Sequence, residues 1–358
     1  MGINSVFFRF ISGIYLKSFF IIFLSLAGFF VVVDLLVNYK ELPNSANLIL
    51  LYVLFVFCVA TSYVLPLSLV FALILSLSSL VRSNELVSFY ALGLSKKQVI
   101  AYPFFWALFF SAVFVGLNFT PFAYAEDYQY SILRNSKISA QSEDIFLKYD
   151  DKFIYIQRLE SLDERVQMMK IFSIEDFALK RLSTVKSAVF KDNAWLLEEG
   201  EFIAMPKNLE LFGEGLSVQK IENIEALSGF KPRIIESVVN QSQYSILDGA
   251  LSFLAFYKQN VNTNLIRTEL YRLLFTPFFA PFLLLILYVF FPSIARFYNL
   301  AFLGFIFFLC TLLLWGLLYL LNKFTQNGLF SPELGLIVPI LVLILASGFV
   351  FYKKTRQI

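Results

Sequence analysis

The chain has 358 residues, of which 58% are hydrophobic and 15% are charged, and its formal net charge is +3. Soluble domains are much less apolar, and so small a net charge gives no sign of a nucleic-acid partner. The sequence has no histidine, which removes the commonest metal ligand and the commonest general base. We therefore expect a membrane protein without a metal site, a cofactor or nucleic-acid binding.

Three long apolar stretches lie before residue 123, near residues 14–37, 48–80 and 98–122. About 20 apolar residues span the hydrocarbon core of a bilayer, so each stretch is predicted to be a transmembrane helix. The first helix is expected to be retained, because no small-residue cleavage site follows a short apolar core as in signal peptides. Pro66 lies midway through the second stretch and is expected to bend that helix.

Residues 83–95, between the second and third stretches, are predicted to form a short amphipathic helix. Its apolar face is expected to consist of Leu86, Phe89, Tyr90 and Gly93. Glu85 lies at the start, where a carboxylate suits the positive end of a helix, and Gly93 is suited to end the helix. From these residues alone, the helix is either a connector at the membrane surface or the docking site of a separate motor protein.

Residues 123–267 carry most of the charge and are predicted to form a β-rich domain. Short runs of alternating apolar residues recur along this region, separated by turn-forming residues. The expected strands are Asp144–Tyr149, Lys152–Arg158, Gln167–Ile174, Val185–Phe190 and Ala194–Glu198. Many short strands with frequent turns favour a β-sandwich or a jelly roll. Residues 245–257 then change to helical periodicity, with Ser245 as the expected N-cap.

Three further apolar stretches follow, near residues 270–292, 297–321 and 333–352. The fold class predicted is therefore an α-helical membrane protein with six transmembrane helices, three on each side of an inserted β-jellyroll-like domain. The predicted domains are residues 1–122, 123–267 and 268–358.

Lysine and arginine residues in the short loops indicate the orientation of the helices. With the N-terminus in the cytoplasm, the cytoplasmic segments hold Arg9, Arg82, Lys96, Lys97, Arg296, Lys353, Lys354 and Arg356. The short outer loops hold only Lys40 and Lys323. This distribution predicts that both termini are cytoplasmic and that the central domain is outside, which in a Gram-negative bacterium means the periplasmic side of the inner membrane.

Three segments carry motifs whose order and spacing match a known family. They are Arg82-Ser83-x-Glu85-Leu86 with Ala91-x-Gly93-x-Ser95, the run from Ala188 through Trp195 to Gly200, and Glu269-Leu-Tyr-Arg272 with Pro277. Together they resemble the LptF/LptG permeases, the membrane subunits of the lipopolysaccharide-extracting ABC transporter. The likeness covers essentially the whole chain, and the sequence Arg-Ser-Asn-Glu-Leu favours the G-type subunit.

The resemblance implies a function and a set of partners. Two related six-helix subunits would enclose a cavity, extract lipopolysaccharide from the outer leaflet of the inner membrane and pass it to a periplasmic bridge. The implied partners are a cytoplasmic ABC ATPase dimer, a second permease subunit of the same type, a periplasmic jellyroll bridge protein, a single-span accessory subunit and lipopolysaccharide. The chain has no Gly-x-x-x-x-Gly-Lys-Ser/Thr loop for ATP phosphates, so it is expected to be a transport subunit and not an enzyme.

The resemblance also implies site residues. Coupling to the ATPase is assigned to Glu85, Leu86, Phe89 and Gly93. Binding of the lipid phosphates is assigned to cationic residues near the outer helix ends, which are Lys40, Arg134, Lys137, Arg272 and Lys323. Each cation could instead be an ordinary interfacial side chain, and Arg272 could pair with Glu269 one turn before it.

Two other functions stay open. A membrane-anchored periplasmic hydrolase would have only paired carboxylates to use, such as Asp150 with Asp151 or Glu198 with Glu199, and no catalytic residue is assigned. A subunit that transmits motion of the ATPase without moving a lipid would share the helix at residues 83–95. Such a subunit would need no lipid-sized cavity.

Overall fold

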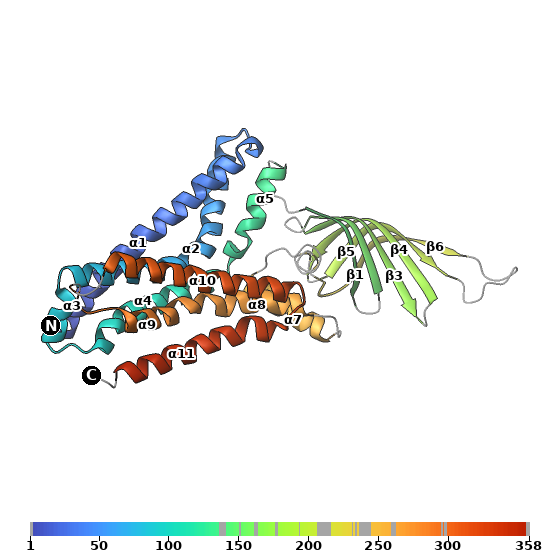
Figure 1. The fold of residues 1–358 in the computed structure, drawn as a ribbon. Helices are drawn as coiled ribbons and strands as arrows, with labels where there is room; N and C mark the ends of the chain where they lie inside the picture. Colours follow the sequence, from blue (N-terminus) through green and yellow to red (C-terminus); the bar gives the residue numbers. More distant parts are fainter. Residues whose placement is uncertain are drawn as a thin grey trace. The chain divides into compact units, whose positions relative to one another are not determined.

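The computed structural model describes residues 3–135, 141–149, 152–160, 164–175, 178–192, 194–205, 216–230, 232, 235, 245–258, 263–294, 296 and 299–355. Contacts within the chain divide it into two compact units. The helical unit comprises Met1–Lys40, Val53–Ala125 and Arg267–Ile358, and the sheet unit comprises Glu41–Tyr52 and Glu126–Ile266. Figure 1 shows the elements of both units coloured along the chain.

Six helices are long and apolar enough to cross a membrane, which confirms the six predicted spans. They run over Val6–Val37, Ala46–Arg82, Lys96–Leu117, Asn264–Phe290, Leu300–Gln326 and Glu333–Lys353. Several ends differ from the predicted ones, and the first span begins at Val6 instead of near residue 14. Residues 6–13 are mostly apolar but include Arg9 and Ser12, and they continue the helix of the first apolar stretch.

The first three spans are α1 (Ile3–Val37), α2 (Ala46–Arg82) and α4 (Lys96–Leu117), and the short helix α3 (Glu85–Ala91) lies between the last two. The 3-10 turns η1 (Tyr39–Glu41) and η2 (Pro121–Tyr124) follow α1 and α4. Pro66 lies inside α2 without ending the helix. Because proline has no N–H, the backbone carbonyl of Ser62 loses its usual partner four residues later.

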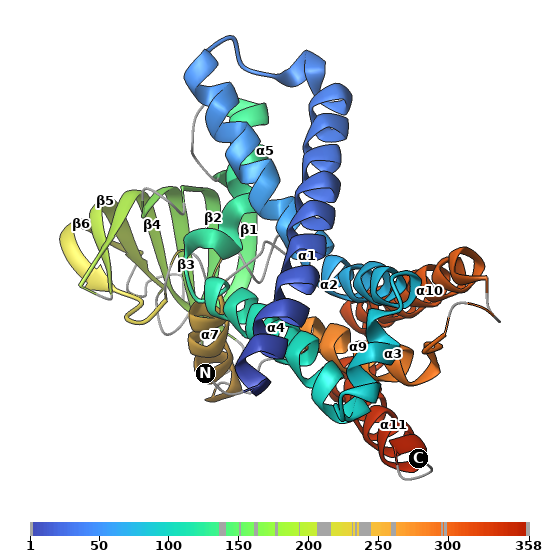
Figure 2. The ribbon, with the colours of Figure 1, turned by 90° about the vertical axis from the view of Figure 1, so that its left-hand side faces the viewer.

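The fourth span consists of α8 (Asn264–Phe275), the 3-10 turn η3 (Thr276–Phe278) and α9 (Phe279–Phe290). Pro277 lies in η3 and accounts for the interruption, since it cannot donate a backbone hydrogen bond. The fifth span is α10 (Leu300–Gln326), and the sixth consists of the π-helical turn η5 (Glu333–Ile337) and α11 (Val338–Thr355). Helix α9 contacts α4 and α11, and α1 contacts α4, so the two triplets form one bundle (Figure 2).

The interior of the helical unit is apolar, and so is its outer surface. Leu69 and Leu73 of α2 and Phe279 and Leu284 of α9 are buried in the core. Large apolar side chains such as Phe29 are exposed along α1, and others are exposed along α10. A helix that is apolar on all sides is typical of a membrane span, where the outer face contacts lipid.

Six antiparallel strands form one sheet in the sheet unit, which confirms an inserted β domain. The strands are β1 (Gln141–Tyr149), β2 (Lys152–Glu160), β3 (Arg165–Glu175), β4 (Ala178–Lys191), β5 (Ala194–Ala204) and β6 (Ser217–Ala226). Each pairs with the next along the chain, so the order is β1 to β6 and the sheet is a meander (Figure 1). The sheet is strongly curved, with β1 and β6 at its edges (Figure 2).

One face of the sheet encloses a second hydrophobic core, to which Ile154 and Ile156 of β2 contribute. Trp195 of β5 is fully buried there, and its Nε1–H donates to the carbonyl oxygen of Phe230 at 2.6 Å. Gly200 lies where β5 passes close to β4, because a Cβ atom at this position would lie 2.6 Å from the carbonyl oxygen of Thr184. The family-like run from Ala188 to Gly200 is therefore the β4–β5 hairpin of this domain.

Five of the six strands include the predicted runs, and β6 was not predicted. Two helices complete the sheet unit, α5 (Ala125–Asn135) and α7 (Ile246–Lys258). The Oγ atom of Ser245 accepts a hydrogen bond from the backbone N–H of Asp248 at 3.1 Å, which confirms Ser245 as the N-cap of α7.

Candidate functional site

Helix α3 lies between two residues with left-handed backbone conformations. Asn84, just before the helix, has a φ of 60°, and Gly93, just after it, has a φ of +89°. The N–H of Gly93 bonds the carbonyl oxygen of Tyr90, and the N–H of Leu94 bonds that of Phe89, each at 3.0 Å. These two bonds form a Schellman motif, in which glycine is the favoured left-handed residue. Gly93 therefore ends α3, as predicted.

A second cap starts α4 directly after this motif. The Ser95 backbone N–H donates to Gln98 Oε1 at 2.8 Å, and the Gln98 backbone N–H donates to Ser95 Oγ at 3.3 Å. This reciprocal pair is a capping box. The segment from Asn84 to Ser95 is thus closely specified by its backbone hydrogen bonds.

The predicted apolar face of α3 packs into the helical unit itself. Leu86 is 2% exposed and Phe89 is 7% exposed, and both belong to the core cluster of this unit. The ring of Phe89 contacts Phe7 and Phe10 of α1 edge to face, with centroid distances of 5.6 and 5.8 Å. Leu86 and Phe89 therefore hold α3 on the bundle.

The opposite face of α3 is open. Val87 is 37% exposed and Leu92 is 71% exposed, and Ser88 is exposed between them. Glu85 is half-buried, and no lysine or arginine of the described chain lies within salt-bridge distance of its carboxylate. Val87, Ser88 and Leu92 are thus exposed to a partner, and Glu85 is partly accessible to it.

A chain of hydroxyl groups joins α3 to the fourth span. The Tyr90 and Tyr288 hydroxyls lie 2.9 Å apart, and Tyr288 donates to the backbone carbonyl of Lys96 at 3.0 Å. Burial raises the pKa of the Tyr90 phenol, while hydrogen bonds with Tyr288 and Ser293 partly oppose that increase. Helices α3, α4 and α9 are therefore linked by side-chain hydrogen bonds as well as by packing.

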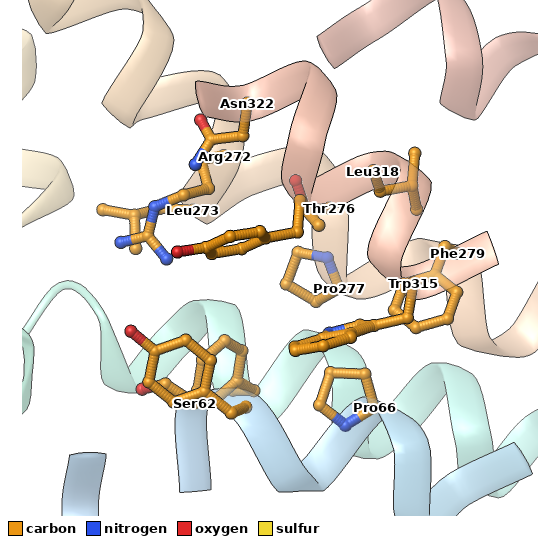
Figure 3. A pocket seen from close by; sticks show the side chains of 13 residues that line it. Ser62, Pro66, Arg272, Leu273, Thr276, Pro277, Phe279, Trp315, Leu318 and Asn322 are labelled. Carbon is orange, nitrogen blue, oxygen red and sulfur yellow. The ribbon is translucent and has the colours of Figure 1, made fainter. Parts of the chain in front are cut away.

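A partly open cavity of about 70 Å³ lies among α2, α4, the fourth span and α10, all within the helical unit (Figure 3). Its walls are mostly apolar and include Pro66, Pro277 and Trp315. Its polar lining residues are Ser62, Tyr63, Arg272, Thr276, Tyr319 and Asn322. Figure 3 shows Arg272 and Asn322 on one side of the cavity, and Ser62 and Pro66 on the other.

Arg272 is paired with Glu269, as one of the sequence alternatives expected. Its Nε–H donates to Glu269 Oε2 at 2.9 Å, and its Nη2–H donates to Glu269 Oε1. Both side chains are more than three-quarters buried. Such a two-pronged pair is well oriented and electrically neutral as a whole.

The other predicted cations lie in different surroundings. Lys323 is exposed, donates to Gln326 Oε1 at 3.0 Å and lies 5.8 Å above the ring of Tyr319, which lines the cavity. Lys40 is exposed in η1. Arg134 lies in α5, and Lys137 falls outside the described residues. The structure therefore places Arg272 in the wall of the cavity and Lys323 over Tyr319, one of the lining residues.

A second ion pair, not predicted from the sequence, joins the fourth and sixth spans. Arg267 of α8 donates to Glu333 Oε1 of η5 at 2.6 Å, and the hydroxyl of Tyr271 lies 3.4 Å from the same oxygen. The two residues are 66 positions apart, so sequence spacing gives no sign of this contact.

Comparison with protein families identifies the family of the chain. A model of the lipopolysaccharide export system permease LptF/LptG matches residues 9–353, which is nearly the whole chain. The chain belongs to the LptF/LptG family. A comparison with curated proteins found no significant match.

Membership of the LptF/LptG family has several consequences. The family consists of transport permeases, so the chain is a multi-pass inner-membrane protein of the lipopolysaccharide export system. The family model does not separate the two subunit types, so the G-type assignment stays a prediction. The carboxylate pairs considered for a hydrolase gain no support, because Glu199 forms an exposed ion pair with Lys186 at 2.7 Å and Asp150 and Asp151 lie outside the described residues.

Proposed function

We propose that this chain is a permease subunit that extracts lipopolysaccharide from the outer leaflet of the inner membrane and passes it to a periplasmic bridge. The observation that carries the proposal is the LptF/LptG family match over residues 9–353. The six spans and the inserted sheet domain agree with such a role. The partners we propose are a cytoplasmic ABC ATPase dimer, a second permease subunit of this family, a jellyroll bridge protein and a single-span accessory subunit.

The ATPase is proposed to bind the open face of α3. Leu92 and Val87 would supply the apolar contacts, and Glu85 would pair with a basic residue of the ATPase. The resemblance assigns coupling to Leu86, Phe89 and Gly93, and these residues would contribute indirectly. They fix the position and the end of the helix instead of touching the ATPase.

The lipid is proposed to meet the bundle near the predicted outer ends of the spans. Lys323 is exposed there beside the cavity, which supports a contact with a lipid phosphate. Arg272 is a weaker candidate for phosphate binding, because Glu269 already occupies two of its donors. Lys40 and Arg134 remain candidates by their position in the sequence.

Purification of the tagged full-length chain from native membranes tests the proposal. We expect to recover an ATP-binding protein, a second six-span subunit and bound lipopolysaccharide. Recovery of the ATPase without any glycolipid would favour a subunit that only transmits motion. Recovery of neither the ATPase nor glycolipid would refute the permease assignment.

A further inference from the structure

Helix α7 carries an exposed apolar stripe that consists of Leu247, Leu251, Leu254 and Tyr257. These four side chains are between 45% and 66% exposed. They are spaced three or four positions apart, so they lie in a row along one side of the helix. Ala250 is exposed as well, so every exposed side chain that the structure describes in α7 is apolar or aromatic. Such a face indicates a partner that removes it from water.

The opposite side of α7 is already covered by the chain. Gly249, Ser252 and Phe256 are buried there, and the Ser252 hydroxyl donates to the backbone carbonyl of Asp248 at 2.6 Å. Ser245 caps the start of the helix, as described above. Surface helices of soluble proteins place polar residues on the open side, and α7 does not. Its open side is therefore not an ordinary solvated surface.

The chain connection keeps α7 close to the membrane. Helix α7 ends at Lys258, and the fourth membrane span begins at Asn264, six residues later. An extended chain covers at most about 3.6 Å per residue, so these two points are no more than about 20 Å apart. The end of α7 is thus tethered near the surface of the bilayer that this span enters.

The length of the apolar stripe determines how the helix can meet the bilayer. The stripe extends from Leu247 to Tyr257, which is nearly the whole of this 13-residue helix. At 1.5 Å per residue it is about 15 Å long. All of it can enter the lipid at once only if the helix lies parallel to the membrane surface. Helices of this kind bury their apolar face about 5–10 Å into the boundary between headgroups and acyl chains, a level that also suits tyrosine.

We infer that α7 is an interfacial helix whose apolar stripe inserts into the leaflet on the predicted periplasmic side of the membrane. Continuity with the fourth span favours lipid over a protein partner as the occupant. The exposed residues point the same way, because protein interfaces combine an apolar centre with a polar rim and the only polar group here is the Tyr257 hydroxyl. The inference goes beyond the proposed function, since it holds whatever lipid the protein transports.

Spin labelling of the full-length chain in vesicles of phosphatidylethanolamine and phosphatidylglycerol tests the inference. Cys58→Ala and Cys310→Ala remove the native thiols, and one nitroxide-labelled cysteine is then introduced as Leu251→Cys or Leu254→Cys. Relaxation of the label by oxygen, which concentrates among acyl chains, is compared with relaxation by a water-soluble nickel chelate. Val218→Cys is the matched control, because Val218 is an aliphatic residue of the same unit that is 58% exposed on β6.

The labels on the stripe should be several-fold more accessible to oxygen than to nickel, and the label at Val218 should show the reverse. A further variant carries the label as Leu247→Cys together with Leu251→Gln and Leu254→Gln. Loss of the two leucines should move this label into water and raise its accessibility to nickel several-fold. Leu251→Met with Leu254→Met is the matched control and should leave the label inserted, because methionine keeps the apolar volume.

Nickel accessibility on the stripe equal to that at Val218 would overturn the inference, since the stripe would then face water. Shielding from both reagents would overturn it as well, since protein would then cover the stripe. A label at position 247 that stays inserted in the glutamine variant would also overturn it, because the stripe would not be what holds the helix in the lipid. These measurements involve neither the ATPase nor lipid transport, so their outcome is independent of the permease assignment.

Discussion

Leu92→Ala is expected to weaken binding of the ATPase while leaving the stability of the chain nearly unchanged. Leu92 is 71% exposed on α3, so most of its side chain is available to a partner. Complete burial of a leucine contributes about 1.5–3 kcal/mol, and 71% of that range is about 1–2 kcal/mol. This corresponds to roughly 5- to 30-fold weaker binding of the ATPase.

Leu86→Ala should have the opposite effect on the same helix. Leu86 is 2% exposed and is already buried within the chain, so truncation should lower the free energy of unfolding by about 2–5 kcal/mol. The assay measures the affinity of purified ATPase for the detergent-solubilised permease, together with thermal unfolding of each variant. Both variants remove the same atoms, so they form a matched pair.

A Leu92→Ala variant that binds the ATPase as tightly as the wild type would refute the assignment of this face. A Leu86→Ala variant that unfolds like the wild type but loses the ATPase would show that the buried face is the one that docks. The second result would return the coupling role to the apolar face predicted from the sequence.

Three further predictions concern stability. Gly93→Ala should destabilise the chain by about 1 kcal/mol in thermal unfolding, because φ is +89° at this position. Gly93→Asn should lose less stability, because asparagine tolerates the left-handed conformation better, and equal losses would contradict the capping role. Trp195→Phe should cost about 1–3 kcal/mol in denaturant unfolding, since the buried carbonyl of Phe230 loses its donor, and an unchanged midpoint would exclude that bond. Burial raises the pKa of Tyr90, so its contribution to stability is present below the unfolded pKa of about 10 and is lost as the pH rises toward the folded pKa. Tyr90→Phe should therefore make the decline in melting temperature at alkaline pH less steep. An identical decline in both proteins would exclude Tyr90 as its source.

The features that depend on nearby residues were predictable. The six spans follow from continuous apolar length, which a bilayer imposes on any helix that crosses it. Gly93 and Ser245 were identified as caps because a helix end is specified by its own flanking residues. The Arg272–Glu269 pair was foreseen for the same reason, since the residues lie one turn apart.

The features that depend on distant residues were not predictable. The apolar face of α3 was identified, but only the contacts of Phe89 with α1, about 80 positions earlier, show that this face points into the chain itself. Strand β6 was missed because its apolar residues do not alternate and Val218 is exposed, as is common in an edge strand. The cavity at Asn322 could not be foreseen, because its walls come from helices far apart in the sequence.

The hydroxyl chain from Tyr90 through Tyr288 to Lys96 has a mechanical consequence. Helix α3 cannot shift far from the bundle without breaking these bonds or pulling on α4 and α9 at the same time. Its two left-handed ends, Asn84 and Gly93, join it to the neighbouring spans without slack. A push on the outer face of this short helix would thus be distributed over three membrane spans as a nearly rigid displacement, and little work would be lost in bending the helix itself.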